Sequence, residues 1–109
     1  MSKADEMFEK LGYKKIEHNI FKKGEEPKAN EWITQDEPYI EYRDEEIIHK
    51  TYYSMFIMFM MTCKCVQIGG CEKGRKSDGT YYLIARNPIL ETDEVNAINE
   101  KCKELGWIK

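Results

Sequence analysis

The sequence predicts an α+β fold: an antiparallel sheet of four or five strands with the N-terminal and C-terminal helices packed on one face. Three observations lead to this prediction. Residues 53–63 carry no charge in a chain of which 34% is charged, so this run should form the centre of the core. Helical periodicity appears near the two ends of the chain. Aromatic and β-branched segments separated by polar turns lie between these ends.

Length and composition indicate one domain, residues 1–109, with a single core. A hydrophobic fraction of 41%, with 12% aromatic residues, is typical of a folded chain. The net charge of −3 comes from 17 basic and 20 acidic residues that are mixed along the sequence. This balance lacks the basic surface that binding to nucleic acid requires, so we do not expect nucleic acid as a partner.

The sequence also carries signals about the compartment. The N-terminus has no basic segment followed by an apolar one, as a signal peptide would have. Lys64 ends the apolar run before it reaches the roughly twenty residues that a membrane span needs. We therefore expect a cytoplasmic protein without membrane contact, in which the cysteines at positions 63, 65, 71 and 102 are reduced thiols.

A short helix is expected at residues 3–11, where apolar residues recur at helical spacing. Ser2 is the expected N-cap, with Asp5 as its capping partner. Gly12 would end the helix in a left-handed conformation, so that Tyr13 folds back on the last turn. The apolar stripe consists of Ala4, Met7, Phe8 and Leu11.

A second helix is expected at residues 93–105. Thr92 is its expected N-cap, and the acidic residues that follow suit the positive end of the helix dipole. Gly106 would end it, with Trp107 packing behind in the manner of Tyr13. Its apolar stripe consists of Val95, Ile98, Cys102 and Leu105.

Between the helices, the first strand is expected within residues 13–23, and a turn at residues 24–27 follows it. Residues 28–37 read as a loop or a short edge strand. A strand containing Tyr39, Ile40 and Tyr42 would then end at a tight polar turn formed by residues 43–46. Ile47 and Ile48 are expected to begin the strand that continues into the central stretch.

The central stretch, residues 51–68, has two readings. Its aromatic and β-branched residues favour a strand, whereas its four methionines favour a helix. Periodicity does not decide, because the middle of the run is apolar on every side. We predict one long central strand, or two strands separated by a bulge, paired with the strand at residues 80–85. Exposure of part of the Met-rich run would favour a homodimer through that face.

Residues 69–79 are rich in glycine and polar side chains, and they read as the loop of an extended hairpin arm. Asp78 and Gly79 are a turn signal. Phosphate binding is disfavoured, because a phosphate loop leads into a helix and this one leads into a strand. Lys73, Arg75 and Lys76 give the arm a basic tip suited to an acidic partner.

The two ends of the chain also carry a resemblance. Residues 4–13 (ADEMFEKLGY) and 92–107 (TDEVNAINEKCKELGW) resemble the terminal helices of small uncharacterised proteins of phages and prophages of Gram-positive bacteria. The likeness covers about a quarter of the chain and consists of helix stripes, glycine stops and aromatic residues. It implies a phage origin and carries over no catalytic residue.

The cysteines are compatible with two kinds of chemistry. Cys63, Cys65 and Cys71 could bind zinc with a fourth ligand from His18, His49 or Cys102, although one intervening residue departs from the usual Cys-x(2–4)-Cys spacing. A thiol nucleophile activated by one of the histidines is conceivable, but no oxyanion hole or orienting group is evident. We therefore expect no enzyme, no cofactor and no metal.

The sequence thus favours a non-enzymatic phage-type accessory protein that binds a host or phage protein, for example to inhibit a bacterial defence or regulatory factor. The alternative is a zinc-binding nucleic-acid or regulatory module built on the cysteine cluster. The residues expected to contact the partner protein are Lys73, Arg75, Lys76, Trp32, Tyr39 and Tyr42.

Overall fold

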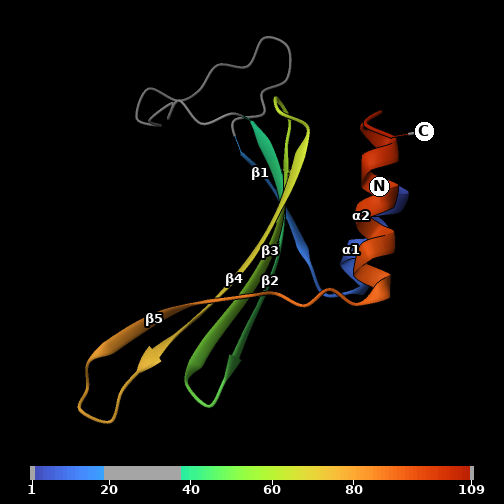
Figure 1. Cartoon of the computed structure of the whole chain (residues 1–109). Helices are drawn as coiled ribbons and strands as arrows, with labels where there is room; N and C mark the ends of the chain where they lie inside the picture. Colours follow the sequence, from blue (N-terminus) through green and yellow to red (C-terminus); the bar gives the residue numbers. More distant parts are fainter. Residues whose placement is uncertain (1, 19–37, 109) are drawn as a thin grey trace, which may run out of the picture.

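A computed structural model describes residues 2–18 and 38–108, and it confirms the predicted fold class (Figure 1). A five-stranded antiparallel sheet has the order β1-β2-β3-β4-β5, so each strand pairs with its neighbours in sequence. Both helices lie on one side of this sheet. The elements are α1 (Lys3–Lys10), β1 (Lys14–His18), β2 (Tyr39–Ile48), β3 (Thr51–Met60), β4 (Cys65–Arg75), β5 (Tyr81–Arg86) and α2 (Thr92–Glu104).

Both helices end in the same backbone motif, as their common Leu-Gly-aromatic sequence predicts. Gly12 has φ +95° and Gly106 has φ +75°, both in the left-handed region that glycine occupies without strain. The amide of Tyr13 donates to the carbonyl of Phe8 at 3.0 Å, and that of Trp107 donates to the carbonyl of Cys102 at 2.9 Å. These 6→1 bonds define a Schellman motif at each end.

The N-terminal caps of the two helices differ. The Ser2 hydroxyl accepts a hydrogen bond from the Asp5 amide at 3.0 Å, which confirms the predicted cap of α1. The prediction of Thr92 as N-cap of α2 was wrong. Glu91 occupies that position in a reciprocal capping box with Glu94, because a glutamate side chain at the N-cap can also reach the backbone amide of Glu94.

The core lies between the helices and the part of the sheet closest to them. Phe8 of α1 stacks on Tyr42 of β2 with ring centroids 3.9 Å apart, and Phe59 of β3 meets both rings edge-on. The ring centroids of Trp107 and Phe59 are 6.1 Å apart, so Trp107, which follows Gly106, belongs to the same cluster. The buried members are Phe8, Tyr13, Ile40, Tyr42, Ile57, Phe59 and Ala97.

The central stretch is a hairpin, not one strand or two strands joined by a bulge. A turn at residues 61–64 separates β3 from β4, and β4 continues through the expected glycine loop as far as Arg75. Within residues 53–63 only Ile57 and Phe59 are buried, whereas Tyr53 and Cys63 are exposed. The prediction that the whole run lies in the core was therefore wrong, because its alternate side chains face opposite sides of the sheet.

The turn expected at residues 43–46 lies inside β2, and the chain reverses at His49 and Lys50 instead. Both residues have positive φ, +49° and +65°, as a two-residue type I′ hairpin turn requires. Ile47 and Ile48 therefore end β2, where they are exposed, and do not begin the central strand.

Two glycines place β4 close to its neighbours. A Cβ atom on Gly69 would lie 2.3 Å from the Phe56 ring, so the aromatic ring of β3 covers this glycine across the strand pair. Gly74 is similarly covered by Tyr82 of β5. Because β4 occupies the space beside β3, β5 pairs with β4, and the predicted pairing of residues 80–85 with the central strand was wrong.

The far ends of the strands extend beyond the helices. Figure 1 shows the β2–β3 and β4–β5 hairpins reaching away from α1 and α2. Large apolar side chains on these hairpins remain exposed, among them Ile47 (74%), Tyr81 (74%) and Leu83 (72%). We call this part of the sheet the distal half.

Candidate functional site

A groove on the distal half is the strongest candidate for a functional site. It has a volume of about 970 Å³ and is open to solvent. The β2–β3 turn and strands β3, β4 and β5 all contribute to it. Its charged and aromatic lining includes His49, Lys50, Tyr52, Lys73, Arg75 and Tyr81. We call this feature the distal groove.

The register of the sheet brings these side chains together. Tyr52 of β3 lies opposite Lys73 of β4, and Arg75 of β4 lies opposite Tyr81 of β5. The Lys73 ammonium lies 4.4 Å from the centre of the Tyr52 ring, and the Arg75 guanidinium lies 4.7 Å from that of Tyr81. Arg75 also donates a hydrogen bond to the Tyr81 hydroxyl. Cation–π contacts of this kind orient the cations over apolar surface without neutralising their charge.

The distal groove is positive in a chain whose net charge is negative. Among the described residues that line it, Lys50, Lys73 and Arg75 are basic and none is acidic. The neighbouring Glu45 is engaged by Tyr52 and Arg43, whose hydrogen bonds lower the pKa of this carboxyl. This carboxylate is therefore ionised at neutral pH, and Arg43, 3.3 Å away, carries the charge that balances it.

Glu72, although adjacent to Lys73, faces the other side of the sheet. Its carboxylate accepts hydrogen bonds from Arg86 at 2.6 Å and from Tyr82 at 3.0 Å. The hydrogen bond from Arg86, and then that from Tyr82, lowers the pKa of Glu72. This carboxylate is thus already paired and does not neutralise Lys73.

The six residues predicted to contact a partner protein do not form one surface in the structure. Lys73 and Arg75 line the distal groove, and Lys76 lies in the adjoining β4–β5 turn. Tyr39 stacks on His18 at the opposite end of β2, with ring centroids 4.2 Å apart.

Tyr42 is 1% exposed and belongs to the core, so its prediction as a contact residue was wrong. Its parity in β2 places it beneath α1, which the sequence alone did not reveal. Trp32 lies outside the described residues.

Sequence reasoning missed Lys50, Tyr52 and Tyr81, which complete the distal groove. These three come from different segments, and only the strand register makes them neighbours of Lys73 and Arg75. The available signal was the alternation within each strand, which places Tyr52 on one face and Tyr53 on the other. This alternation identifies the residues of the groove only when the position of the β2–β3 turn is known, and that turn was predicted wrongly.

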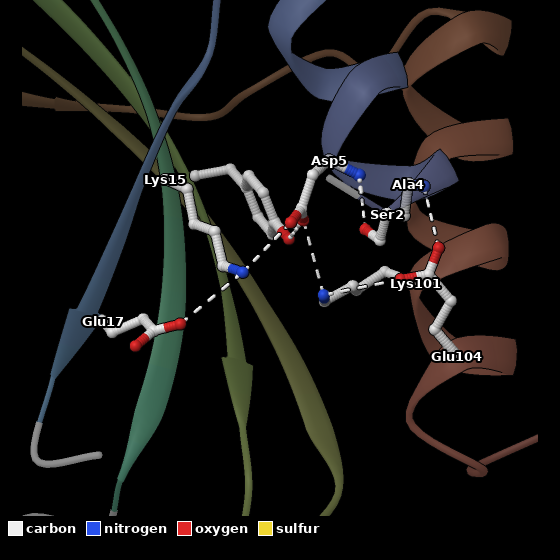
Figure 2. A network of polar contacts seen from close by, with 8 residues as sticks. Ser2, Ala4, Asp5, Lys15, Glu17, Lys101 and Glu104 are labelled. Carbon is white, nitrogen blue, oxygen red and sulfur yellow. Dashed lines mark hydrogen bonds and ion pairs between the residues drawn. The ribbon is translucent and has the colours of Figure 1, made fainter. Parts of the chain in front are cut away.

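A second polar cluster lies between α1, α2 and the sheet (Figure 2). The Asp5 carboxylate accepts hydrogen bonds from the Tyr42 hydroxyl at 2.5 Å and from the Lys15 ammonium at 3.0 Å. Lys101, which is 5% exposed, lies 3.4 Å from Asp5 and 3.6 Å from Glu104. The Glu104 carboxylate in turn accepts from the Ala4 amide at 2.8 Å, so α2 supplies a cap to α1.

This cluster strongly favours the ionised form of Asp5. Burial alone would raise the pKa of Asp5, but the hydrogen bonds from Tyr42 and Lys15 and the charge of Lys101 lower it to about 2. Burial and the hydrogen bond to Asp5 raise the pKa of Tyr42 above its ordinary value. Every polar group here has a partner within the cluster, so we interpret it as a structural link between helices and sheet.

The cysteines do not form the zinc site considered from the sequence. Cys63 lies in the β3–β4 turn, whereas Cys65 and Cys71 both lie on β4. Six residues of extended chain separate Cys65 from Cys71, which corresponds to about 20 Å. Zinc–sulfur bonds are about 2.3 Å long, so these three thiols cannot share one ion. In residues 2–18 and 38–108, no group of three or more His, Cys, Asp or Glu side chains is arranged to hold a metal.

Two of the thiols lie outside the lining of the distal groove. The Cys71 sulfur lies 3.0 Å from the Ser54 hydroxyl across the β3–β4 pair. Burial raises the pKa of the Cys102 thiol, which lowers the fraction of the nucleophilic thiolate at neutral pH. The Cys102 thiol therefore lacks the setting of an activated nucleophile.

Comparisons with known protein families, with curated proteins and with solved structures give no match. In the described part of the chain, neither helix has the length and apolar character that crossing a membrane would require.

Proposed function

We propose that this protein is a non-enzymatic binding protein whose distal groove holds an acidic segment of another protein. One observation carries the proposal: within a chain of net charge −3, Lys50, Lys73 and Arg75 converge on a surface with exposed aromatic and aliphatic side chains. Charge complementarity steers a partner to such a surface, and apolar contacts hold it there.

A protein segment fits this surface better than nucleic acid does. Nucleic-acid binding normally uses a basic stripe long enough to follow several phosphates. Here the described lining offers two lysines and one arginine, with exposed Leu83 beside them. A polypeptide with both carboxylates and apolar side chains matches this composition.

The resemblance of the terminal helices to phage proteins supplies the biological setting of the proposal. The protein would act in the cytoplasm of a bacterial host as a phage-type accessory protein. Its partner would be a host or phage protein, and occupation of an acidic surface on a defence or regulatory factor would inhibit that factor.

Affinity capture with a charge-reversal variant tests the proposal. The wild-type protein and the double variant Lys73→Glu/Arg75→Glu are immobilised, exposed to a Gram-positive bacterial lysate, and the retained proteins are identified by mass spectrometry. We expect the wild type to retain a specific acidic protein and the variant to retain at least tenfold less, because both cations of β4 now repel carboxylates.

The matched control is Lys3→Glu/Lys64→Glu, which changes the net charge equally at exposed positions in α1 and in the β3–β4 turn, outside the lining of the distal groove. This control should retain the same protein as the wild type. Equal loss in both variants, or no specific protein retained by the wild type in repeated captures, would contradict the proposal.

A further inference from the structure

Strand β5 is an open edge of the sheet. It pairs with β4, and no strand of the described chain pairs with its other side. Tyr81 and Leu83 are 74% and 72% exposed on the groove face, and Ile84 is 43% exposed on the opposite face. Alternate amides and carbonyls of an edge strand point outward and are available to another strand.

The other edge of the sheet is protected against such pairing. Strand β1 has the sequence KKIEH, in which three of five residues are charged at neutral pH. Charged side chains on an edge are a common device against strand addition. By contrast, Arg86 is the only charged residue of β5 and it lies at the end of the strand, where Glu72 pairs with it. The two edges therefore differ in their capacity to accept a further strand.

The register places the basic residues of the distal groove beside this open edge. Arg75 lies opposite Tyr81 and Lys73 lies opposite Leu83. Because neighbouring strands are about 4.8 Å apart, a strand added at β5 would lie about 10 Å from the backbone of β4. Extended Arg and Lys side chains cover most of that distance, and Arg75 already reaches over the Tyr81 ring towards the edge.

Charge decides which strand fits the edge. A second copy of β5 would bring no carboxylate to Lys50, Lys73 and Arg75, and it would add the cation of Arg86. A strand with carboxylates at alternate positions would place them on the groove face, beside these cations. Its intervening apolar residues would face the side of Ile84.

We propose that the partner segment binds as a sixth strand along β5, with alternate acidic side chains facing the distal groove and apolar ones facing the other side of the sheet. This inference rests on the proposed function, because it specifies the conformation and pattern of the acidic segment. Backbone hydrogen bonds to the edge supply affinity, and the alternating pattern supplies specificity.

Synthetic peptides test this binding mode directly. The probe is acetyl-Thr-Glu-Val-Glu-Val-Glu-Thr-amide with a fluorescent label. The control peptide has the same sequence and label but is N-methylated at every internal residue. Methylation removes the amide donors that a strand needs but keeps the charge. We expect the methylated peptide to bind at least tenfold more weakly in fluorescence anisotropy, and Lys73→Glu/Arg75→Glu to weaken the unmethylated peptide at least tenfold.

The outcomes separate the binding mode from the proposed function. Equal affinity of the two peptides for the wild-type protein would overturn strand addition. Binding in the distal groove would still stand if Lys73→Glu/Arg75→Glu weakened the binding of both peptides. Absence of binding by the unmethylated peptide would also overturn the inference, and the lysate capture would then decide the function independently. A wild-type protein that sediments as a dimer through β5 and excludes the peptide would show that a second copy occupies the edge.

Discussion

Asp5 connects three parts of the molecule through a single carboxylate. It lies in the first turn of α1, accepts a hydrogen bond from Tyr42 on the sheet, and lies beside Lys101 of α2. A half-buried carboxylate is stabilised in its charged form when several donors face it, and here Tyr42, Lys15 and Lys101 do so. This residue therefore links the packing of the helices to pH.

Replacement of Asp5 should reveal this link. Its pKa is about 2 in the folded protein, against an ordinary value of 3.8, and one unit corresponds to about 1.4 kcal/mol. We expect Asp5→Asn to lower the free energy of unfolding by about 2 kcal/mol at pH 7. Because the folded pKa is depressed, this contribution is complete above pH 4 and disappears as the pH falls towards 2.

Urea unfolding of the wild type and of Asp5→Asn at pH 7, 4 and 2.5 measures the effect. Asp93→Asn is the matched control, since Asp93 is an exposed acidic residue in the first turn of α2. Its cost should stay below about 1 kcal/mol, as expected for a helix-dipole effect at the surface. A wild-type advantage over Asp5→Asn that remained constant from pH 7 to 2.5 would contradict the assigned role of this carboxylate.

Single residues also show what the sequence could predict. Ser2, Gly12 and Gly106 act within one or two turns of their own helix, so their local sequence sufficed. Tyr42 could not be placed in the same way. Its burial depends on α1 lying over its face of β2, and nothing within β2 encodes that contact.

At the scale of elements, the pairing of β3 with β4 includes an aromatic ring that covers a glycine. Residues 69 and 70 read as a loop because glycine is normally depleted in strands. In the structure Phe56 fills the space that a side chain at Gly69 would take, so the two residues behave as one packing unit. The sequence signal for this unit lies thirteen residues away, on another strand.

A double-mutant cycle tests this pair. Gly69→Ala places a Cβ atom 2.3 Å from the Phe56 ring, so the ring must move and the free energy of unfolding should fall by about 1–3 kcal/mol. In a Phe56→Ala background the same substitution should cost less than about 0.5 kcal/mol. Chemical denaturation of the four proteins gives the coupling energy, which we expect to exceed about 1 kcal/mol.

The control for this cycle is Ser54→Ala, on the same face of β3 but opposite Cys71. Its effect should add to that of Gly69→Ala without coupling. A cost of Gly69→Ala that is the same with and without the Phe56 ring would show that the glycine is needed for backbone reasons alone.

The reversals between elements explain why the candidate site was only partly predictable. The β2–β3 turn consists of His49 and Lys50, which lack the glycine or asparagine that marks most type I′ turns. The charged segment at residues 43–46 looked more like a turn, yet it is a strand with polar side chains on both faces. Lys73 and Arg75 could be predicted because they stand in one basic segment. The other lining residues could be predicted only from the strand register, which depends on the position of this turn.

At the scale of the whole molecule, the sheet has two halves with different surroundings. The half near α1 and α2 holds the buried cluster and the Asp5 network (Figures 1 and 2). The distal half extends beyond the helices, exposes Tyr81 and Leu83, and carries the distal groove and the open edge of β5. The α+β order could be predicted because it follows from periodicity. The division of the sheet into two halves could not, because it depends on how far the strands extend beyond the helices.

Hydrogen exchange of the complex tests the division most directly. The wild-type protein is measured alone and with the protein captured from the lysate, and deuterium uptake is followed for each segment. We predict slower exchange on binding at residues 49–53, 71–76 and 81–86, with no change in α1 and α2. Protection confined to the helices, with the distal strands exchanging as before, would contradict the account.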